Sequence, residues 1–349
     1  MAQQRKKQAS RPGPEKGDEG SKTHTKADAE TEGEETPSES IALPPGQHVA
    51  LPGRGRIFIR DVAGPPGAPV VLLLHGWFAS GGLNWAMAFD SLSQHFRVIA
   101  PDQRGHGRGI RGWSSFQLED CADDAAALLD ALEIESAIAV GYSMGGPVAQ
   151  LLWRRHPSKV EGLVMCATSG EPVTAGPVAR LAFTSFFSAA AGTARLGQLA
   201  TCVPFSVAGT LVKPLERKEP PLDVLFAVAE MGRHDLRMLF EAGVALGRYR
   251  AKDWIRDIDV PTAIVVTTED RAVIPEGQMH QALEIRDVKI FCVDDGHTAI
   301  TDPSFAEQLR LACIDVADRA AEAVPAGLRA RRRQRMEHAV DALMGEFQA

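Results

Sequence analysis

The sequence predicts a doubly wound α/β fold, in which a mostly parallel, twisted sheet has helices on both faces. The first observation is a series of short apolar runs, such as "APVVLLLHG" and "SAIAVGYSMGG", each ending in Gly, Asp, His or Ser. Continuous apolarity is typical of strands that are buried on both faces. The second observation is that helical patterns such as "LEDCADDAAALLDALEI" lie between these runs. Alternating strands and helices favour a parallel sheet.

Further runs of both kinds complete the predicted order of elements. The other expected strands are "FRVIAPDQRG", "VEGLVMCATSG", "TAIVVTTED" and "VKIFCVDDGH". The other expected helices are "WAMAFDSLSQH", "GGPVAQLLWRRH" and "SFAEQLRLACIDVADRAAEA". The stretch from residue 48, "HVALPGRGRIFIRD", has two short apolar segments around Pro and Gly, which predicts a β-hairpin ahead of the parallel strands.

The chain divides into four predicted parts. Residues 1–42 are poor in aromatic and branched apolar residues, so we expect a disordered tail. The α/β core covers residues 43–170 and 253–322. Residues 171–252 contain several Phe but no convincing strand. Because ordinary loops have about 2 to 6 residues, this long segment predicts a helical cap. Residues 323–349 predict a basic amphipathic helix at the C-terminus.

The composition limits the classes of partner. Of 349 residues, 44% are hydrophobic, which is normal for a globular protein with a large core. The net charge of -7 argues against a nucleic-acid partner. No run of about 18 apolar residues predicts a membrane span, although the basic C-terminal helix leaves weak peripheral association open. The basic N-terminal residues lack the apolar segment of a secretory signal, so a cytoplasmic location is expected.

The five cysteines do not predict a disulfide framework or a zinc site, because they are far apart and lack CxxC spacing. We expect them to be small apolar core residues. No metal or nucleotide motif is present, so no cofactor is predicted. The sequence leaves the oligomeric state open.

The segment "AIAVGYSMGGPVAQ" predicts a reactive serine. Ser143 follows a predicted strand and precedes a predicted helix, within the pattern G-x-S-x-G. The flanking Gly141 and Gly145 leave room for a sharp turn that pushes the serine hydroxyl outward at the end of the sheet. Met144 begins the helix, so its backbone N–H lacks a partner within the helix and can bind a developing oxyanion.

A nucleophilic serine needs a base and an acid, and strand ends supply candidates for both. Of ten histidines, His297 is the one just beyond the last predicted strand and before the last core helix. After the strand "TAIVVTT" come Glu269 and Asp270, of which we favour Asp270. Glu269 and, after the preceding strand, Glu171 remain alternative acids. The elements thus arrive in the order Ser, Asp, His, each at a strand end.

From residue 48 to about 322 the chain resembles the α/β-hydrolase superfamily, in its capped, serine-nucleophile, esterase- and lipase-like form. The resemblance is carried by "LLLHGW", "DQRGHG", "GYSMGG", "TTEDRAVIP" and "DGH" in this order. It implies that Ser143 is the nucleophile, Asp270 the acid and His297 the base. It also implies that the Trp77 backbone N–H is the second oxyanion donor, and that His75 and His106 shape loops.

The expected activity is hydrolysis of a carboxylic ester, or a similar acyl bond, through an acyl-enzyme. The apolar cap indicates a small hydrophobic substrate, although amphipathic cap helices bury apolar faces in any case. Cofactor-independent haloperoxidase-like hydrolases and carbon-carbon bond hydrolases keep a serine triad and remain alternatives. A ligand-binding protein that reuses the fold is the non-enzyme alternative.

Overall fold

The computed structural model describes residues 43–173, 176–201 and 224–323. The predicted tail over 1–42 lies outside the described residues, and so does the predicted C-terminal helix except for its first residue. Two segments of the predicted cap, 174–175 and 202–223, lie outside them too.

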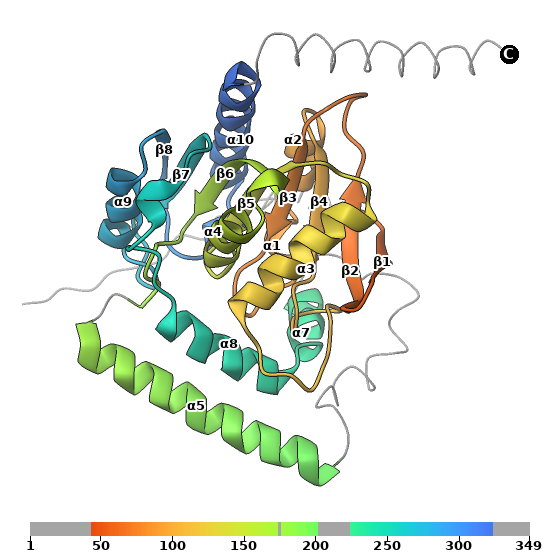
Figure 1. Cartoon of the computed structure of the whole chain (residues 1–349), viewed down its shortest axis with the longest axis vertical. Helices are drawn as coiled ribbons and strands as arrows, with labels where there is room; N and C mark the ends of the chain where they lie inside the picture. Colours follow the sequence, from red (N-terminus) through yellow and green to blue (C-terminus); the bar gives the residue numbers. More distant parts are fainter. Residues whose placement is uncertain (1–42, 174–175, 202–223, 324–349) are drawn as a thin grey trace, which may run out of the picture. The chain divides into compact units, whose positions relative to one another are not determined.

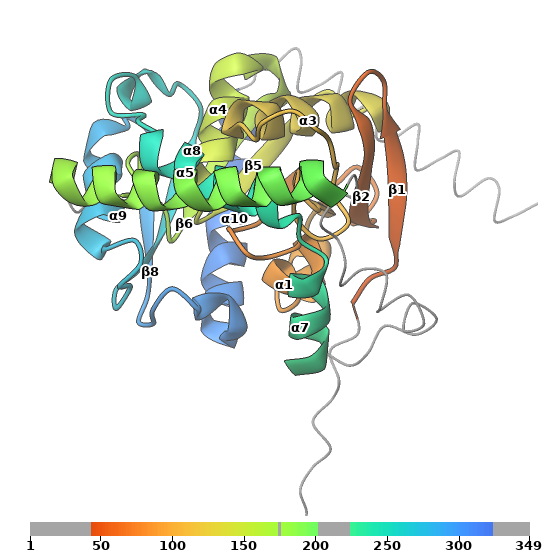
Figure 2. The same cartoon turned by 90° about the horizontal axis from the view of Figure 1, so that it is seen from below.

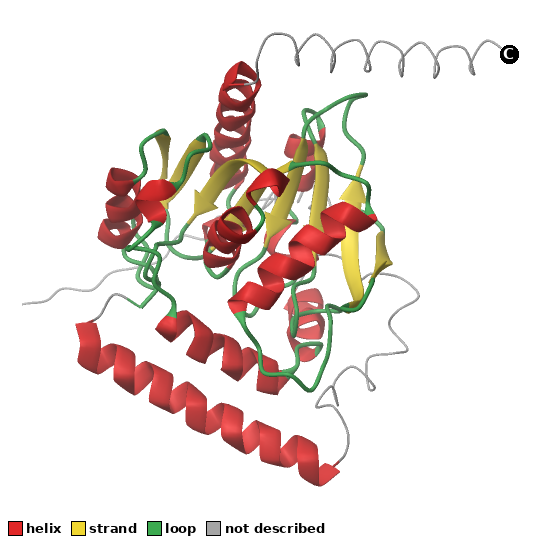
Figure 3. Ribbon diagram, viewed as in Figure 1, coloured by secondary structure: helices red, strands yellow, loops and turns green. Residues whose placement is uncertain are grey.

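Eight strands form a single sheet (Figures 1 and 3). In chain order they are β1 (Gly46–Leu51), β2 (Gly55–Val62), β3 (Val70–Leu74), β4 (Arg97–Pro101), β5 (Ala137–Tyr142), β6 (Val160–Cys166), β7 (Thr262–Thr267) and β8 (Val288–Val293). Across the sheet the order is β1-β2-β4-β3-β5-β6-β7-β8. All neighbouring pairs from β4 to β8 are parallel, whereas β1 and β2 form an antiparallel hairpin. The predicted mostly parallel sheet and its leading hairpin are therefore confirmed.

Helices cover both faces of the sheet, as the continuous apolar strands require. The core helices are α1 (Gly81–Trp85), α2 (Phe89–Ser93), α3 (Leu118–Ala131), α4 (Gly145–Arg155), α9 (Pro275–Glu284) and α10 (Pro303–Ala323). In β3, Leu72 packs in the apolar cluster with α3 and α4, and its neighbour Leu73 packs in the cluster with α2 and α10. Because successive strand residues point to opposite faces, each strand contributes to two apolar layers.

A helical segment interrupts the core between β6 and β7. Its described helices are α5 (Gly176–Thr201), α7 (Val224–Gly232) and α8 (Leu236–Arg248), and we call these three helices the insertion. α5 and α8 lie side by side (Figure 1), and in the view from below α5 lies in front of α8 (Figure 2). Gly247 makes this packing close, because a Cβ there would lie 2.3 Å from the Thr184 side chain of α5. No strand occurs among the described residues of this segment.

Two sequence-based expectations need correction. The helix predicted over residues 85–95 is split into α1 and α2. α1 begins earlier because the Ser80 side chain caps it by accepting a hydrogen bond from the Leu83 N–H at 3.2 Å. Cys121, Cys166 and Cys313 are buried as expected, but Cys292 is exposed. Cys292 lies on β8, an edge strand that has exposed as well as buried residues.

No helix within the described residues is long and apolar enough to cross a membrane. The cytoplasmic location expected from the sequence stays a prediction.

Candidate active site

Ser143 lies in the turn between β5 and α4, at the carboxyl end of a central strand. Its φ is 51°, a left-handed conformation that costs a non-glycine residue on the order of 1–3 kcal/mol. The surroundings stabilise this conformation: the Ser143 N–H donates to the Cys166 carbonyl at 3.0 Å, and the Thr168 hydroxyl donates to the Ser143 carbonyl at 2.8 Å. The strained turn projects the side chain away from the strand end.

The glycines on both sides of Ser143 are required by close backbone approach. A Cβ on Gly141 would lie 2.2 Å from the Gly145 carbonyl oxygen, and a Cβ on Gly145 would lie 2.0 Å from that of Leu74. Neither glycine has a positive φ. The pattern G-x-S-x-G thus reflects the tight packing of the first turn of α4 against β3 and β5.

The structure brings Ser143, His297 and Asp270 into one hydrogen-bonded chain. The Nε2 atom of His297 lies 2.9 Å from the Ser143 hydroxyl, and its Nδ1 lies 2.7 Å from Oδ2 of Asp270. A carboxylate accepts, so the Nδ1 atom carries the proton and Nε2 is free to accept the serine proton. This is the arrangement that a serine nucleophile, a base and an orienting acid need.

Asp270 is buried and is held in its ionised form. Burial alone raises the pKa of its carboxyl, but the hydrogen bond from His297 and that from the Val273 N–H bring the pKa below its usual value. The Ala272 N–H and the Thr267 hydroxyl also donate to it, at 2.8 and 2.9 Å. The carboxylate therefore keeps its charge to a lower pH than an ordinary Asp, and in this form it can orient the imidazole.

The two alternative acids lie elsewhere. The Glu269 side chain is exposed, and its backbone N–H pairs with the Asp295 carbonyl. Glu171 forms an ion pair with Arg180 of α5 at 3.1 Å and lies 3.8 Å from Lys252. Neither carboxylate has a hydrogen bond to His297, so of the three candidates Asp270 alone has the geometry of the orienting acid.

Two further side chains support this chain of contacts and have no signal in the sequence. Gln278 of α9 is fully buried, and its amide donates to the Thr267 hydroxyl at 2.9 Å and to the Val273 carbonyl at 2.7 Å. The Tyr142 hydroxyl donates to the His297 carbonyl at 2.8 Å. Both fix residues on which the position of the imidazole depends.

The two expected oxyanion donors lie next to the serine. Met144 is the N-cap of α4, and Trp77 follows Gly76, whose backbone is close enough that a Cβ there would lie 3.4 Å from the Ser143 Cβ. The Gly76 N–H is already used, because it donates to the Asn84 side chain at 2.9 Å. No hydrogen bond from the Trp77 or Met144 N–H to another described residue is present. These two N–H groups are therefore free to bind a charged oxygen.

Three buried histidines, His75, His106 and His234, pack together near the loop that carries Trp77. The rings of His75 and His106 are 5.3 Å apart, and those of His106 and His234 are 5.4 Å apart. Burial lowers the pKa of His75 and of His234 to about 4, and that of His106 well below its usual value. Nε2 of His75 accepts the Gln103 N–H, and Nδ1 of His234 accepts the Gly107 N–H. They are thus neutral residues that order loops, as the resemblance implied for His75 and His106.

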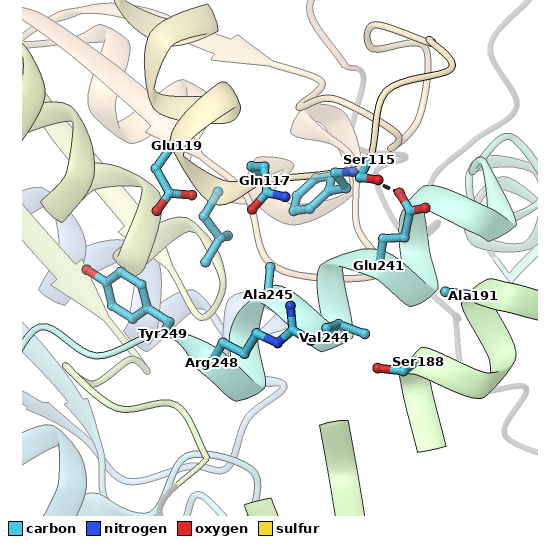
Figure 4. Close-up of a pocket in the computed structure, with 12 residues that line it drawn as sticks. Ser115, Gln117, Glu119, Ser188, Ala191, Glu241, Val244, Ala245, Arg248 and Tyr249 are labelled. Atoms are coloured by element: carbon cyan, nitrogen blue, oxygen red, sulfur yellow. Dashed lines mark hydrogen bonds between the residues drawn. The ribbon is translucent and has the colours of Figure 1, made fainter. Parts of the chain in front are cut away.

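A cavity of about 360 Å³ lies between α5, α8 and the start of α3 (Figure 4). It is lined by Ser115, Phe116, Gln117, Leu118, Glu119, Ser188, Ala191, Glu241, Val244, Ala245, Arg248 and Tyr249. None of these is Ser143, Asp270 or His297. The Glu241 carboxylate on its wall is already paired, since it accepts from the Phe116 N–H and from Arg237. Because none of the three residues Ser143, Asp270 and His297 lines it, the cavity is separate from the serine.

Within the described residues, no cluster of three or more His, Cys, Asp or Glu could hold a metal ion.

A sequence profile of the α/β hydrolase fold family matches residues 69–286, more than half of the chain. The chain therefore belongs to the α/β hydrolase fold family.

Individual relatives differ in their chemistry. The chain is 39% identical to a bifunctional esterase/perhydrolase of Acinetobacter calcoaceticus over 103 residues, which are 29% of this chain and 37% of the relative. It is 41% identical to a 2-hydroxymuconate semialdehyde hydrolase of Pseudomonas sp. (strain CF600) over 96 residues, 27% of this chain and 34% of the relative. The matched segments thus span little more than a third of these relatives.

A solved structure is similar over a longer range. A thermophilic esterase from Thermogutta terrifontis superposes with a TM-score of 0.60 at 22% identity, covering 79% of this chain and 99% of the esterase. This likeness supports the fold. It agrees with the family shown by the sequence profile.

Proposed function

We propose that this protein is a serine hydrolase that cleaves a carboxylic ester, or a similar acyl bond, through an acyl-enzyme. The observation that carries the proposal is the hydrogen-bonded chain from Ser143 through His297 to the buried Asp270. Such a chain converts a weak hydroxyl nucleophile into a reactive one, and its end at the carboxyl edge of the sheet leaves the serine accessible to substrate.

The reaction has two halves. His297 takes the Ser143 proton as the hydroxyl attacks the ester carbonyl, and the Trp77 and Met144 N–H groups stabilise the oxyanion. His297 then gives the proton to the leaving alcohol. In the second half, His297 activates a water molecule that hydrolyses the acyl-enzyme and restores the serine. No cofactor is needed for either half.

The substrate is proposed to be small and hydrophobic. Trp77 and Phe78 lie in the loop that carries the proposed oxyanion donor, which we call the oxyanion loop. Phe183 and Phe187 of α5 contact Trp77, with ring centroids 6.3 and 5.0 Å away. Aromatic and apolar side chains line most small-molecule sites. A series of p-nitrophenyl esters from acetate to decanoate measures this, and a preference for acetate would remove the hydrophobic-acyl proposal.

The principal test is Ser143→Ala, with Ser91→Ala on α2 as a matched control. We expect kcat on p-nitrophenyl butyrate to fall by about 10⁴- to 10⁶-fold in Ser143→Ala, because the nucleophile is lost, and to be unchanged in the control. The same protein should react with a fluorophosphonate at Ser143, as found by mass spectrometry. Turnover by Ser143→Ala at the wild-type rate would overturn the proposal, and absence of labelling would favour a ligand-binding protein.

Carbon-carbon bond hydrolysis is the second candidate, favoured by the 41% identity to a 2-hydroxymuconate semialdehyde hydrolase. A haloperoxidase-like reaction remains a third, since the same serine geometry would serve it. Measuring hydrolysis of 2-hydroxymuconate semialdehyde beside the ester series separates the first two. A kcat/KM at least tenfold higher for the semialdehyde would replace ester cleavage as the proposed reaction.

A further inference from the structure

Trp77 connects the loop beside Ser143 to the insertion. Its backbone belongs to the oxyanion loop, and its side chain reaches into the insertion. The indole Nε1–H donates to the carbonyl of Leu239 in α8 at 3.0 Å, across 162 positions in the sequence. This hydrogen bond ties the loop beside Ser143 to a helix of the insertion.

The indole is also packed tightly on the side of the insertion. Its ring centroid lies 5.0 Å from that of Phe187 in α5, nearly edge to face. In α8, a Cβ on Gly243 would lie 2.7 Å from Phe187 Cγ and 2.9 Å from Trp77 Cη2. Gly243 is therefore required because the backbone of α8 presses on both rings. The indole has little room to move without moving α5 or α8.

The core holds this loop at Gly76, whose carbonyl lies 2.8 Å from Nδ1 of His75 and accepts the Ala79 N–H at 3.4 Å. The Gly76 N–H is fixed by Asn84, a buried residue of α1. Beyond Trp77, Phe78 has a φ of 61°, an unfavourable conformation for an aromatic residue. A strained backbone of this kind persists only where contacts on both sides hold it. On the side of the insertion, the hydrogen bond from Trp77 to Leu239 and the edge-to-face contact of Trp77 with Phe187 are those contacts.

We propose that the insertion sets the position of the Trp77 N–H, and therefore the stability of the oxyanion, through the indole side chain. The insertion then governs the rate of the chemical step as well as substrate binding. Trp77 is in this sense both a donor, through its backbone, and a positioning residue, through its side chain. The inference rests on the proposed hydrolase function of Ser143.

Trp77→Phe tests it, because the aromatic ring stays and the hydrogen bond to Leu239 is lost. Loss of one oxyanion donor costs about 10²- to 10³-fold, so its misplacement should lower kcat by about tenfold. We expect the same factor for p-nitrophenyl acetate and butyrate, with KM changed less than about twofold. The second-order rate of fluorophosphonate labelling should fall by a similar factor, because the phosphonyl oxygen occupies the same site.

A residue that only lines the substrate pocket gives a different result. KM would then change, and the size of the effect would depend on acyl length. That pattern, or an unchanged kcat, would overturn the inference.

Gly243→Ala perturbs the same contact from the other side. The new methyl group pushes on Phe187 and Trp77, so kcat should fall by about three- to tenfold. The double variant with Trp77→Phe should lose less than the product of the two single effects, because both act on one contact. Gly192→Ala on α5 is the matched control, since a Cβ there meets nothing within 4 Å. We expect its kcat and melting temperature to equal those of the wild type.

The outcomes separate this inference from the proposed function. If the wild type is not labelled at Ser143, the hydrolase proposal fails. If the wild type is labelled and turns over esters, but Gly243→Ala and a folded Trp77→Phe keep wild-type kcat, only the coupling of the insertion to the oxyanion loop fails.

Discussion

The proposed triad (Ser143, Asp270 and His297) and the loop that carries the proposed oxyanion donor Trp77 differ in which part of the chain supports them. Asp270 accepts hydrogen bonds from Thr267, Ala272 and Val273, all of the core, and the carbonyl of His297 accepts from Tyr142 of β5. Trp77, by contrast, has its side chain bound to Leu239 of the insertion. In the proposed mechanism, activation of the nucleophile therefore depends on the core, whereas stabilisation of the oxyanion depends on the insertion too.

This difference separates two kinds of variant. Changes at the triad should lower the rate severely whatever the state of the insertion. Changes in the insertion should lower the rate moderately, and Ser143 should still be labelled by a fluorophosphonate.

Among the residues that support the serine and the imidazole, Asp270 should have the largest effect on kcat when it is replaced, here by Asn. The amide keeps the shape but removes the charge that orients the imidazole and stabilises its protonated form, so kcat should fall by about 10³- to 10⁴-fold. Steady-state kinetics on p-nitrophenyl butyrate measures this. Glu269→Gln is the neighbouring control and should keep the wild-type rate. Equal losses in the two variants would mean that Asp270 is not the orienting acid.

Gln278→Ala should have a smaller effect on the same half of the site. It removes the donors to the Thr267 hydroxyl and the Val273 carbonyl, leaving buried polar groups unpaired at a cost of about 1–3 kcal/mol. We expect a lower melting temperature and a kcat reduced by about tenfold, since Asp270 loses its fixed surroundings. Leu283→Ala, at an exposed position of the same helix, controls for damage to α9. A kcat equal to that of the wild type would show that Asp270 is positioned without Gln278.

The sequence predicts the parts of this site that lie at strand ends. The apolar runs locate the strands, and parallel strands end at one edge of a sheet, so Ser143, His297 and an acid after β7 are expected to meet. The sequence favours Asp270 but leaves Glu269 and Glu171 as alternatives, because adjacent residues in a loop carry no periodic signal. Gln278 and the bond from Trp77 to Leu239 have no local pattern at all. They depend on how α8 and α9 pack against the sheet, which a single sequence does not encode as a motif.

His234, in the turn between α7 and α8, connects the insertion to the core. Nδ1 of His234 accepts the Gly107 N–H at 3.0 Å, and the adjacent Asp235 N–H donates to the Gly105 carbonyl at 2.9 Å. A protonated His234 cannot accept that bond. Around the ring lie the imidazoles of His75 and His106, the Arg111 guanidinium and the Glu230 carboxylate.

The acid sensitivity of this contact follows from linkage. In the unfolded chain the pKa of His234 is its ordinary 6.5, and burial lowers it to about 4 in the folded protein. Above pH 6.5 both states are neutral there and the group has no effect. Between pH 6.5 and 4 the unfolded state binds more protons, so stability falls as the pH falls. His75, with a pKa lowered by burial to about 4, acts in the same direction and the same window.

His234→Asn should therefore have the smallest effect at neutral pH and a visible one in acid. The asparagine amide can accept the Gly107 N–H without titrating, so the loss of stability between pH 6.5 and 4 should shrink by about 1–3 kcal/mol. Urea unfolding at several pH values measures the slope, with His95→Asn, at an exposed histidine, as the control. The rate of fluorophosphonate labelling at pH 7.5 should match the wild type, because the asparagine keeps the bond to Gly107 and with it the position of the insertion. If the free energy of unfolding of His234→Asn falls with pH as steeply as that of the wild type, His234 does not cause the acid sensitivity. The contact between the insertion and the core would then be insensitive to protonation of that ring.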